Sequence, residues 1–177
     1  MRRLALTSAV VIAAVAATTA QAHGPTRKKV EETVEINASP DKVWKVIGNF
    51  QDMSWLPLVE KTEGKGGNEV KATRVLTLKG GATVEEELAK YDAEKKLLMY
   101  RITKVDVKTL PVNDYSSTIE LEGDGAKTKM TWRGAFYRGY MNNDPPPELN
   151  DEASKKAVLG LYKAGLENVK AKAEKGS

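Results

Sequence analysis

The amino-acid sequence predicts an α+β fold, in which a curved antiparallel sheet of about six or seven strands wraps around one long C-terminal helix. Between residues 69 and 137, stretches rich in Val, Thr and Leu alternate with turns that contain glycine, a pattern typical of strands joined by hairpins. From Glu148 to about Lys172, apolar residues recur instead at helical spacing. Because a strongly curved sheet around one helix encloses space, we expect a pocket between the two.

The first 22 residues have the pattern of a secretory signal peptide. Two arginines, Arg2 and Arg3, precede an apolar run over residues 4–17, and the small residues that end at Ala22 form a cleavage site before His23. The run is too short and too weakly flanked for a membrane-spanning helix. We therefore expect export to the periplasm, with no stable membrane insertion once the leader is cleaved.

After the leader we expect one domain with short ends. The predicted division is a signal peptide over 1–22, a flexible N-terminal arm over 23–29, a single domain over 30–173 and a C-terminal tail over 174–177. The chain has no cysteine, which excludes disulfides, thiol catalysis and thiolate metal sites. Its 28 Lys and Arg exceed its 24 Asp and Glu only slightly, and two of the basic residues lie in the leader. So small an excess argues against nucleic-acid binding.

The start of the domain predicts a strand followed by two short helices. Apolar and polar residues alternate over 30–36, as in a half-buried strand. Ser39 is a good helix N-cap, and Pro40 suits the first helical position, where its missing N–H costs nothing. The large residues that follow recur at helical spacing: Val43, Trp44, Ile47 and Phe50. We expect a second short helical segment over 53–59.

The middle of the chain predicts a meander of about five or six strands. The strands that we expect cover 69–79, 83–91, 96–105, 111–122 and 127–137. Glycines at 80–81 and 123–125 supply the positive φ that tight hairpins need. Neighbouring strands should therefore pair in an antiparallel sheet.

The last helix follows three consecutive prolines at 145–147 and carries small residues in its interior. These residues lie where the helix would meet the sheet: Gly160, Ala164 and Gly165. Glycine costs roughly 1 kcal/mol in a helix interior relative to alanine, so two of them in one helix suggest a packing reason. We expect them either to let the helix approach the sheet closely or to leave space beneath it.

In the order and spacing of these segments, the chain resembles the START/Bet v 1-like helix-grip superfamily, in its polyketide cyclase/dehydrase-like branch. The resemblance covers residues 30–172 and implies the helix-grip fold. The segments that carry it are Ala38–Trp44, Gly48–Phe50, Trp55–Pro57, Gly80–Glu87, Tyr91–Glu94, Leu110–Tyr115 and Thr131–Arg133.

Within that superfamily, the leader and the regions 111–115 and 137–140 resemble the periplasmic MxaD-type proteins that accompany methanol oxidation in methylotrophic bacteria. The resemblance implies a non-enzymatic accessory protein without a cofactor, whose partners are methanol dehydrogenase and its c-type cytochrome acceptor. We expect the partner to contact an exposed loop before the prolines. The candidate contact residues are Arg138, Tyr140, Asn142, Asn143 and Asp144.

Few residues could carry out catalysis. The one histidine, His23, lies at the cleavage site, so a Ser-His-Asp triad is not available inside the domain. After cleavage, its amino group and imidazole could chelate copper, but the sequence has no second histidine to complete such a site. We favour a frayed terminus at His23 and predict no metal site.

Glu86 is the most informative acidic residue in the predicted sheet. It lies between Val84 and Leu88 in the alternation, so its carboxylate would point toward the apolar side. Buried there, it would have a raised pKa and could act as an acid or base. We favour a structural ion pair with Arg74 or Arg101, because such pairs perturb carboxylates as often as catalysis does.

Large side chains from separate elements are predicted to meet between the sheet and the long helix. They are Trp55, Tyr100, Tyr115, Trp132, Phe136 and Leu161. Such residues form either packed core or the wall of a pocket, and both can hold in one fold.

Three functions remain open. They are an accessory protein of methanol oxidation, a carrier of a small hydrophobic ligand, and a cyclase- or hydrolase-like enzyme that uses Glu86 or Glu87. A filled or narrow cavity favours the accessory role. A large, open, polar-lined cavity would favour the enzyme, because a substrate needs room beside the acid or base.

Overall fold

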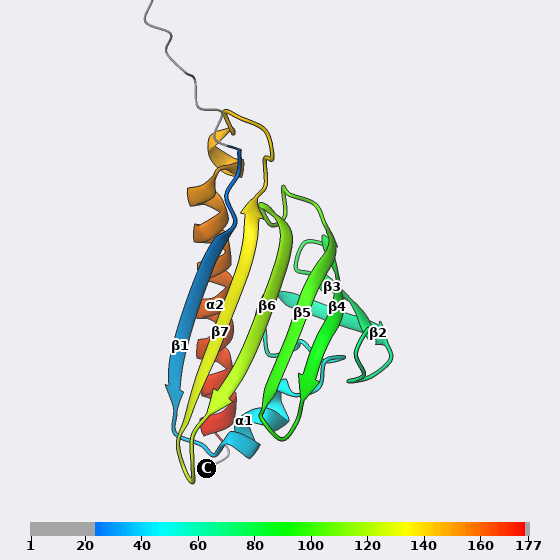
Figure 1. Ribbon diagram of the computed structural model, residues 1–177. Coiled ribbons are helices and arrows are strands. Elements are labelled where there is room, and N and C mark those ends of the chain that lie inside the picture. Colours follow the sequence, from blue (N-terminus) through cyan, green and yellow to red (C-terminus); the bar gives the residue numbers. More distant parts are fainter. Residues whose placement is uncertain (1–23, 176–177) are drawn as a thin grey trace, which may run out of the picture.

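A computed structural model describes residues 24–175 of the chain. Its sheet has seven antiparallel strands in the order β1-β7-β6-β5-β4-β3-β2. The long helix α2 runs along one face of this curved sheet, and the short helix α1 lies at one end of it (Figure 1). The predicted α+β helix-grip fold is therefore confirmed.

The strands and helices follow one another in a simple order. The strands are β1 (Lys28–Ile36), β2 (Val59–Lys65), β3 (Thr73–Leu78), β4 (Thr83–Asp92), β5 (Leu97–Val105), β6 (Val112–Glu122) and β7 (Thr128–Arg138). The helices are α1 (Pro40–Ile47) and α2 (Asp151–Glu174), with one 3-10 turn, η1 (Pro147–Leu149), before α2. Strands β2 to β7 form a meander, and β1 pairs with β7.

The N-terminal end of the described chain belongs to the sheet. Strand β1 begins at Lys28, and Arg27 before it bonds to Asp114 and Ser116 on β6. The last residues of the predicted 23–29 arm are thus tied to the domain. The predicted leader and its cleavage site at Ala22 and His23 lie outside the described residues.

The second short helix predicted over 53–59 is wrong. Isolated turns occupy this stretch, closed by bonds from the Leu56 N–H to the Met53 carbonyl and from the Val59 N–H to the Leu56 carbonyl, both 2.9 Å. Pro57 explains the difference, because it has no N–H and disfavours helical backbone at the residue before it. Strand β2, which follows, was not predicted.

Strand β2 could not be predicted from the sequence pattern, because it is an edge strand and most of its side chains are exposed to water. Only Val59 is buried in it, and the rest of the strand is Glu, Lys, Thr and Gly. Charged residues at a sheet edge discourage pairing with another chain, but they also remove the apolar alternation by which a strand is recognised.

Helix α1 begins and ends as its sequence predicts. The Ser39 hydroxyl accepts a bond from the Lys42 N–H at 3.4 Å, and Pro40 is the first helical residue. At the other end, the Gly48 N–H donates to the Trp44 carbonyl at 2.7 Å. Capped in this way, the short helix buries Val43 and Ile47 against the end of the sheet.

Helix α2 begins at Asp151, where the Asn150 side chain accepts a bond from the Ala153 N–H at 2.9 Å. Of the three small residues predicted to meet the sheet, only Gly165 does so, because Gly160 and Ala164 are exposed. Close approach to the sheet is therefore confirmed at Gly165, and no space lies beneath the helix at Gly160. A Cβ at Gly165 would lie 2.6 Å from the Trp132 ring, so this glycine allows close approach to the sheet. A Cβ at Gly160 would meet nothing within 4 Å, so this glycine borders open space.

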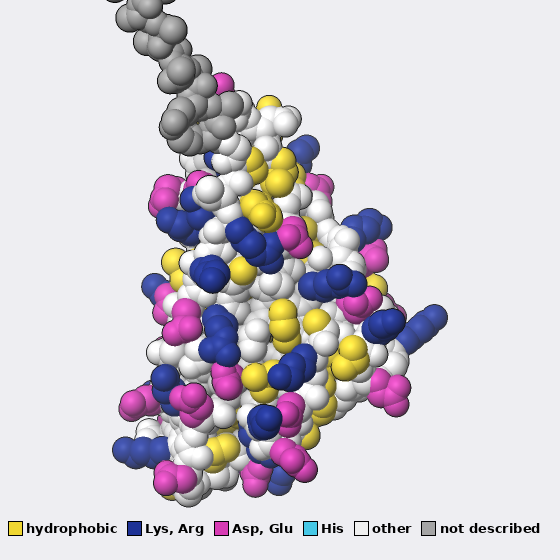
Figure 2. All heavy atoms as spheres, in the orientation of Figure 1, with side chains coloured by type: hydrophobic (Ala, Val, Ile, Leu, Met, Phe, Trp, Pro, Cys, Tyr) yellow, Lys and Arg dark blue, Asp and Glu magenta, His cyan; other side chains and the backbone are white. Residues whose placement is uncertain are grey.

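The outer face of the sheet is polar. Charged side chains of both signs are spread across it (Figure 2), and they form cross-strand ion pairs such as Lys104–Glu85 at 3.0 Å and Arg101–Glu87 at 2.8 Å. Opposite charges on neighbouring strands stabilise a sheet modestly. Neither α1 nor α2, the helices of the described region, has the length and apolarity needed to cross a membrane.

Candidate functional site

Aromatic side chains fill most of the space between the sheet and α2. The Trp132 ring stacks on Tyr162 of α2 with centroids 4.3 Å apart, and Trp55 meets Trp132 edge-on at 5.3 Å. Tyr115 stacks on Phe136 at 6.1 Å. All five side chains are at most 2% exposed. The large residues predicted to meet between the sheet and the long helix are therefore closely packed there.

A buried hydrogen-bond network centred on Ser117 holds these rings. The Ser117 hydroxyl accepts from the Trp132 indole N–H at 2.7 Å and lies 3.0 Å from the Tyr162 hydroxyl. The Tyr162 hydroxyl in turn lies 2.7 Å from that of Tyr115. A Cβ at Gly134 would come within 2.2 Å of the Tyr162 hydroxyl, so glycine leaves room for it. Neither Ser117 nor Tyr162 was among the predicted pocket residues.

The tyrosines of this network are neutral at physiological pH. Burial raises the pKa of Tyr162 to about 12, although hydrogen bonds from Ser117 and Tyr115 oppose this. Burial likewise raises the pKa of Tyr115 and Tyr100 well above 10. Phenols with such pKa values are poor acids or bases, so their role here is to donate and accept hydrogen bonds.

A small cavity of about 50 Å³ remains beside the packed rings. It is lined by Met53, Leu56, Leu58, Leu76, Leu78, Val84, Glu86, Tyr100, Ile102, Thr109, Leu110, Tyr115 and Leu161. Of the predicted pocket residues, the structure thus places Tyr100, Tyr115 and Leu161 on its wall, and Trp55, Trp132 and Phe136 in the packed core. Space of this size suits one or two water molecules rather than a large substrate.

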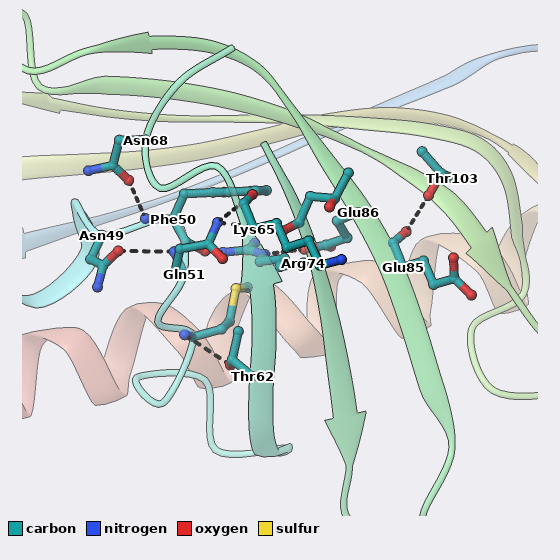
Figure 3. A network of polar contacts seen from close by, with 12 residues as sticks. Asn49, Phe50, Gln51, Thr62, Lys65, Asn68, Arg74, Glu85, Glu86 and Thr103 are labelled. Carbon is teal, nitrogen blue, oxygen red and sulfur yellow. Dashed lines mark hydrogen bonds and ion pairs between the residues drawn. The ribbon is translucent and has the colours of Figure 1, made fainter. Parts of the chain in front are cut away.

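Glu86 lines the cavity and forms a buried ion pair with Arg74 (Figure 3). The two residues face each other in the register of β3 and β4, and the Arg74 Nε donates to the Glu86 Oε2 at 2.6 Å. Both side chains are at most 4% exposed. The predicted ion pair with Arg74 is confirmed, whereas Arg101 pairs with Glu87 instead.

Further contacts fix the Arg74 guanidinium. Its Nη1 donates to the Phe50 carbonyl at 2.8 Å, and its centre lies 4.2 Å from the Phe50 ring and 5.0 Å from the Tyr100 ring. Burial raises the pKa of Glu86, while the adjacent positive charge of Arg74 opposes that rise. If Glu86 took up a proton in catalysis, it would leave the buried guanidinium without its counter-charge, which is costly.

A larger, open groove lies over the cavity on the surface. It has a volume of about 440 Å³ and is lined by Leu56, Pro57, Leu58, Lys79, Thr109, Leu110, Ala157, Gly160, Leu161 and Ala164. Five residues belong to both linings and separate the groove from the cavity: Leu56, Leu58, Thr109, Leu110 and Leu161. One sequence signal points to this groove, the two leucines on either side of Pro57 in a turn, and neither leucine is among the predicted pocket residues.

The predicted partner-contact loop divides into a buried anchor and an exposed part. Arg138 is 8% exposed, and its guanidinium donates to the Tyr140 and Asn142 carbonyls at 2.8 and 2.9 Å. Tyr140 is half-buried, whereas Asn142, Asn143 and Asp144 are exposed. Arg138 therefore shapes the loop from beneath. Within residues 24–175, no three His, Cys, Asp or Glu side chains group in a way that could hold a metal ion.

Solved structures of several proteins resemble this chain. The protein XoxI from Bacillus cereus has a TM-score of 0.67 and 28% identity, over 81% of this chain and 93% of that one. An aromatase/cyclase from Streptomyces sp. R1128 has a TM-score of 0.70 and 21% identity, over 84% and 94%. Norcoclaurine synthase from Thalictrum flavum has a TM-score of 0.62 and 18% identity, over 97% of both chains.

The two enzymes are less than 25% identical to this chain, so they show that the fold is shared and nothing about activity. No curated protein sequence matches the chain. A family model described as polyketide cyclase / dehydrase and lipid transport matches residues 27–174, which is nearly all of the described chain. The chain belongs to this polyketide cyclase/dehydrase and lipid transport family.

Proposed function

We propose that this chain is a non-enzymatic accessory protein of periplasmic methanol oxidation, which assists productive contact between methanol dehydrogenase and its c-type cytochrome. The non-enzymatic part is supported by one observation above all: the interior is filled, and the remaining cavity measures about 50 Å³. A cyclase or hydrolase needs room for its substrate beside a free acid or base.

The one acidic side chain on the cavity wall, among the described residues, also argues against an enzyme. Glu86 is paired with Arg74 at 2.6 Å, and the tyrosines beside it have pKa values far above neutrality. Neither the Glu86 carboxylate nor the tyrosine hydroxyls can exchange a proton at neutral pH without breaking a buried contact. A protein with this interior functions through its surface.

The place of action and the partners are supported by sequence features. The first 22 residues have the pattern of an export signal, and the regions 111–115 and 137–140 resemble MxaD-type proteins. In the structure, Asn113 of the first region donates to the carbonyls of Arg138 and Gly139 at 3.0 and 2.9 Å. The two regions are therefore held side by side, next to the start of the loop 140–146.

Reconstituted electron transfer tests this function. Purified methanol dehydrogenase and its cytochrome are mixed with methanol, and cytochrome reduction is followed spectroscopically with increasing amounts of this protein. We expect the rate to rise with its concentration and to saturate. In cells, deletion of the gene should slow methanol-dependent reduction of the cytochrome, and the exported protein should restore it. An unchanged rate in both assays would refute the accessory role.

A further inference from the structure

The groove over the cavity is an apolar surface without a partner in the described chain. Leu58 is 43% exposed in its wall, although it is a large hydrophobic residue. On the α2 side, Leu161 also lines the groove, and the other three lining residues have small side chains or none: Ala157, Gly160 and Ala164. These three residues span about 10 Å along the helix. The space above them is wide enough for one large apolar side chain.

The walls of this groove are held in place by backbone hydrogen bonds. The Lys79 N–H donates to the Leu58 carbonyl at 2.9 Å, which fixes the turn at 56–58 beside the end of β3. In the loop between β5 and β6, the N–H groups of Thr109 and Leu110 both donate to the Asp106 carbonyl, at 2.8 and 3.1 Å. The groove is therefore formed before anything binds, which lowers the ordering cost of association.

Three lysines without an ion-pair partner lie around the groove. Lys79 lines it, Lys108 precedes the lining residue Thr109, and Lys156 lies one helical turn before Gly160. All three are exposed, and none forms an ion pair with another described residue. Elsewhere in the domain, lysines such as Lys104 and Lys96 are paired with carboxylates. One carboxylate lies in the same loop, where the Asp106 Oδ1 accepts a bond from the Lys108 N–H at 2.9 Å. Three lysines beside this one aspartate leave the rim of the groove with net positive charge.

From this combination we infer that the groove docks an acidic protein partner, which inserts an apolar side chain between Leu58 and α2 while its carboxylates meet the three lysines. An apolar anchor in a pocket surrounded by charged rim contacts is the usual anatomy of a specific interface. Because the inference rests on the accessory function proposed above, the partner is one of the two electron-transfer proteins named there.

A second copy of this chain fits the groove poorly. In a two-fold contact the same patch meets itself, so the lysines of one copy would face those of the other. Like charges brought together across an interface cost binding free energy. The charge of the rim therefore favours a different, acidic protein over self-association.

Binding measurements with the full mature chain test the inference. The wild type is titrated separately against methanol dehydrogenase and the cytochrome by calorimetry, at low and high salt. Gly160→Leu places a large side chain in the groove, at a position where a Cβ meets nothing within 4 Å. Its control, Ala93→Leu, also introduces a leucine, in the exposed turn between β4 and β5 at the opposite end of the sheet.

A second pair of variants tests the charges. Lys79→Glu with Lys156→Glu reverses two rim lysines, and Lys90→Glu with Lys127→Glu reverses two exposed lysines away from the groove. We expect the groove-filling variant and the rim reversal each to weaken binding by about tenfold or more, the latter mainly at low salt. Both control variants should bind within about twofold of the wild type.

The outcomes separate this inference from the proposed function. If the wild type binds neither electron-transfer protein, the accessory function fails. If the wild type binds but both groove variants bind equally well, the function stands and the docking surface is overturned. A loss in Gly160→Leu without any effect of the lysine reversal would overturn the acidic partner. Native mass spectra that show a bound lipid in the wild type and none in Gly160→Leu would assign the groove to a lipid instead, and would also overturn it.

Discussion

The Arg74–Glu86 ion pair predicts a loss of stability that depends on pH. In Arg74→Met an apolar side chain of similar length replaces the guanidinium, and Glu86 stays buried without its cation. Removing one partner of a buried pair costs about 3–5 kcal/mol of unfolding free energy. Part of this loss is independent of pH, because the Phe50 carbonyl also loses its donor, which costs about 1–3 kcal/mol for a buried group.

The rest of the loss depends on whether Glu86 is protonated. Burial already raises the pKa of Glu86, and removing Arg74 takes away the charge that opposes this rise. When a folded pKa lies above the unfolded value, the native state binds more protons between the two values, and stability falls as the pH rises through that window. The slope reaches about 1.4 kcal/mol per pH unit. Arg74→Met should therefore be least stable at neutral pH and recover toward pH 4.5, the ordinary pKa of a glutamate.

Urea denaturation at several pH values between 4.5 and 7.5, followed by tryptophan fluorescence, measures this effect. Arg74→Met with Glu86→Gln removes the titrating group, so it should regain the pH-dependent part of the loss and keep the part due to Phe50. Arg101→Met breaks an exposed pair and should cost less than about 1 kcal/mol at every pH. A loss in Arg74→Met that is the same at all pH values would refute the reasoning.

Four further substitutions test the packing around the site and the cap of α1, each by urea or thermal denaturation. Gly165→Val places a Cβ within 2.6 Å of the Trp132 ring and should lower the free energy of unfolding by about 1–3 kcal/mol. Gly160→Ala meets no neighbour and should leave the stability unchanged or raise it, because alanine favours a helix. Equal effects of the two variants would contradict the close approach at Gly165. Tyr162→Phe removes the hydroxyl that bonds to Ser117 and should lower the free energy of unfolding by about 1–3 kcal/mol. An unchanged stability would contradict the idea that the buried hydroxyls of Ser117 and Tyr115 depend on this partner. Ser39→Ala should cost about 1 kcal/mol through the lost cap of α1, and no change would mean that the 3.4 Å bond contributes little.

Local chemistry allowed much of the fold to be predicted. Ser39 and Pro40 specify where α1 begins because capping depends only on neighbouring backbone groups. The glycines at 80–81 have positive φ, as a tight hairpin demands, and β3 and β4 are joined there. The prediction failed at residues 53–59, because Pro57 has no N–H and disfavours helical backbone at the residue before it.

For the ion pair and the groove, local sequence was not enough. The alternation around Glu86 predicted a buried carboxylate, but it left Arg74 and Arg101 as alternatives, because only the register of β3, β4 and β5 decides which arginine faces it. The groove joins Leu58, Thr109 and Gly160, which are far apart in the chain and carry no shared pattern. Sequence alone determined which elements form and that large residues lie between sheet and helix, because those depend on periodicity and capping. Tertiary structure decided that the rings fill the interior, that Glu86 is neutralised by Arg74, and that an apolar groove with unpaired lysines lies outside, because these depend on distances between residues that only folding brings together.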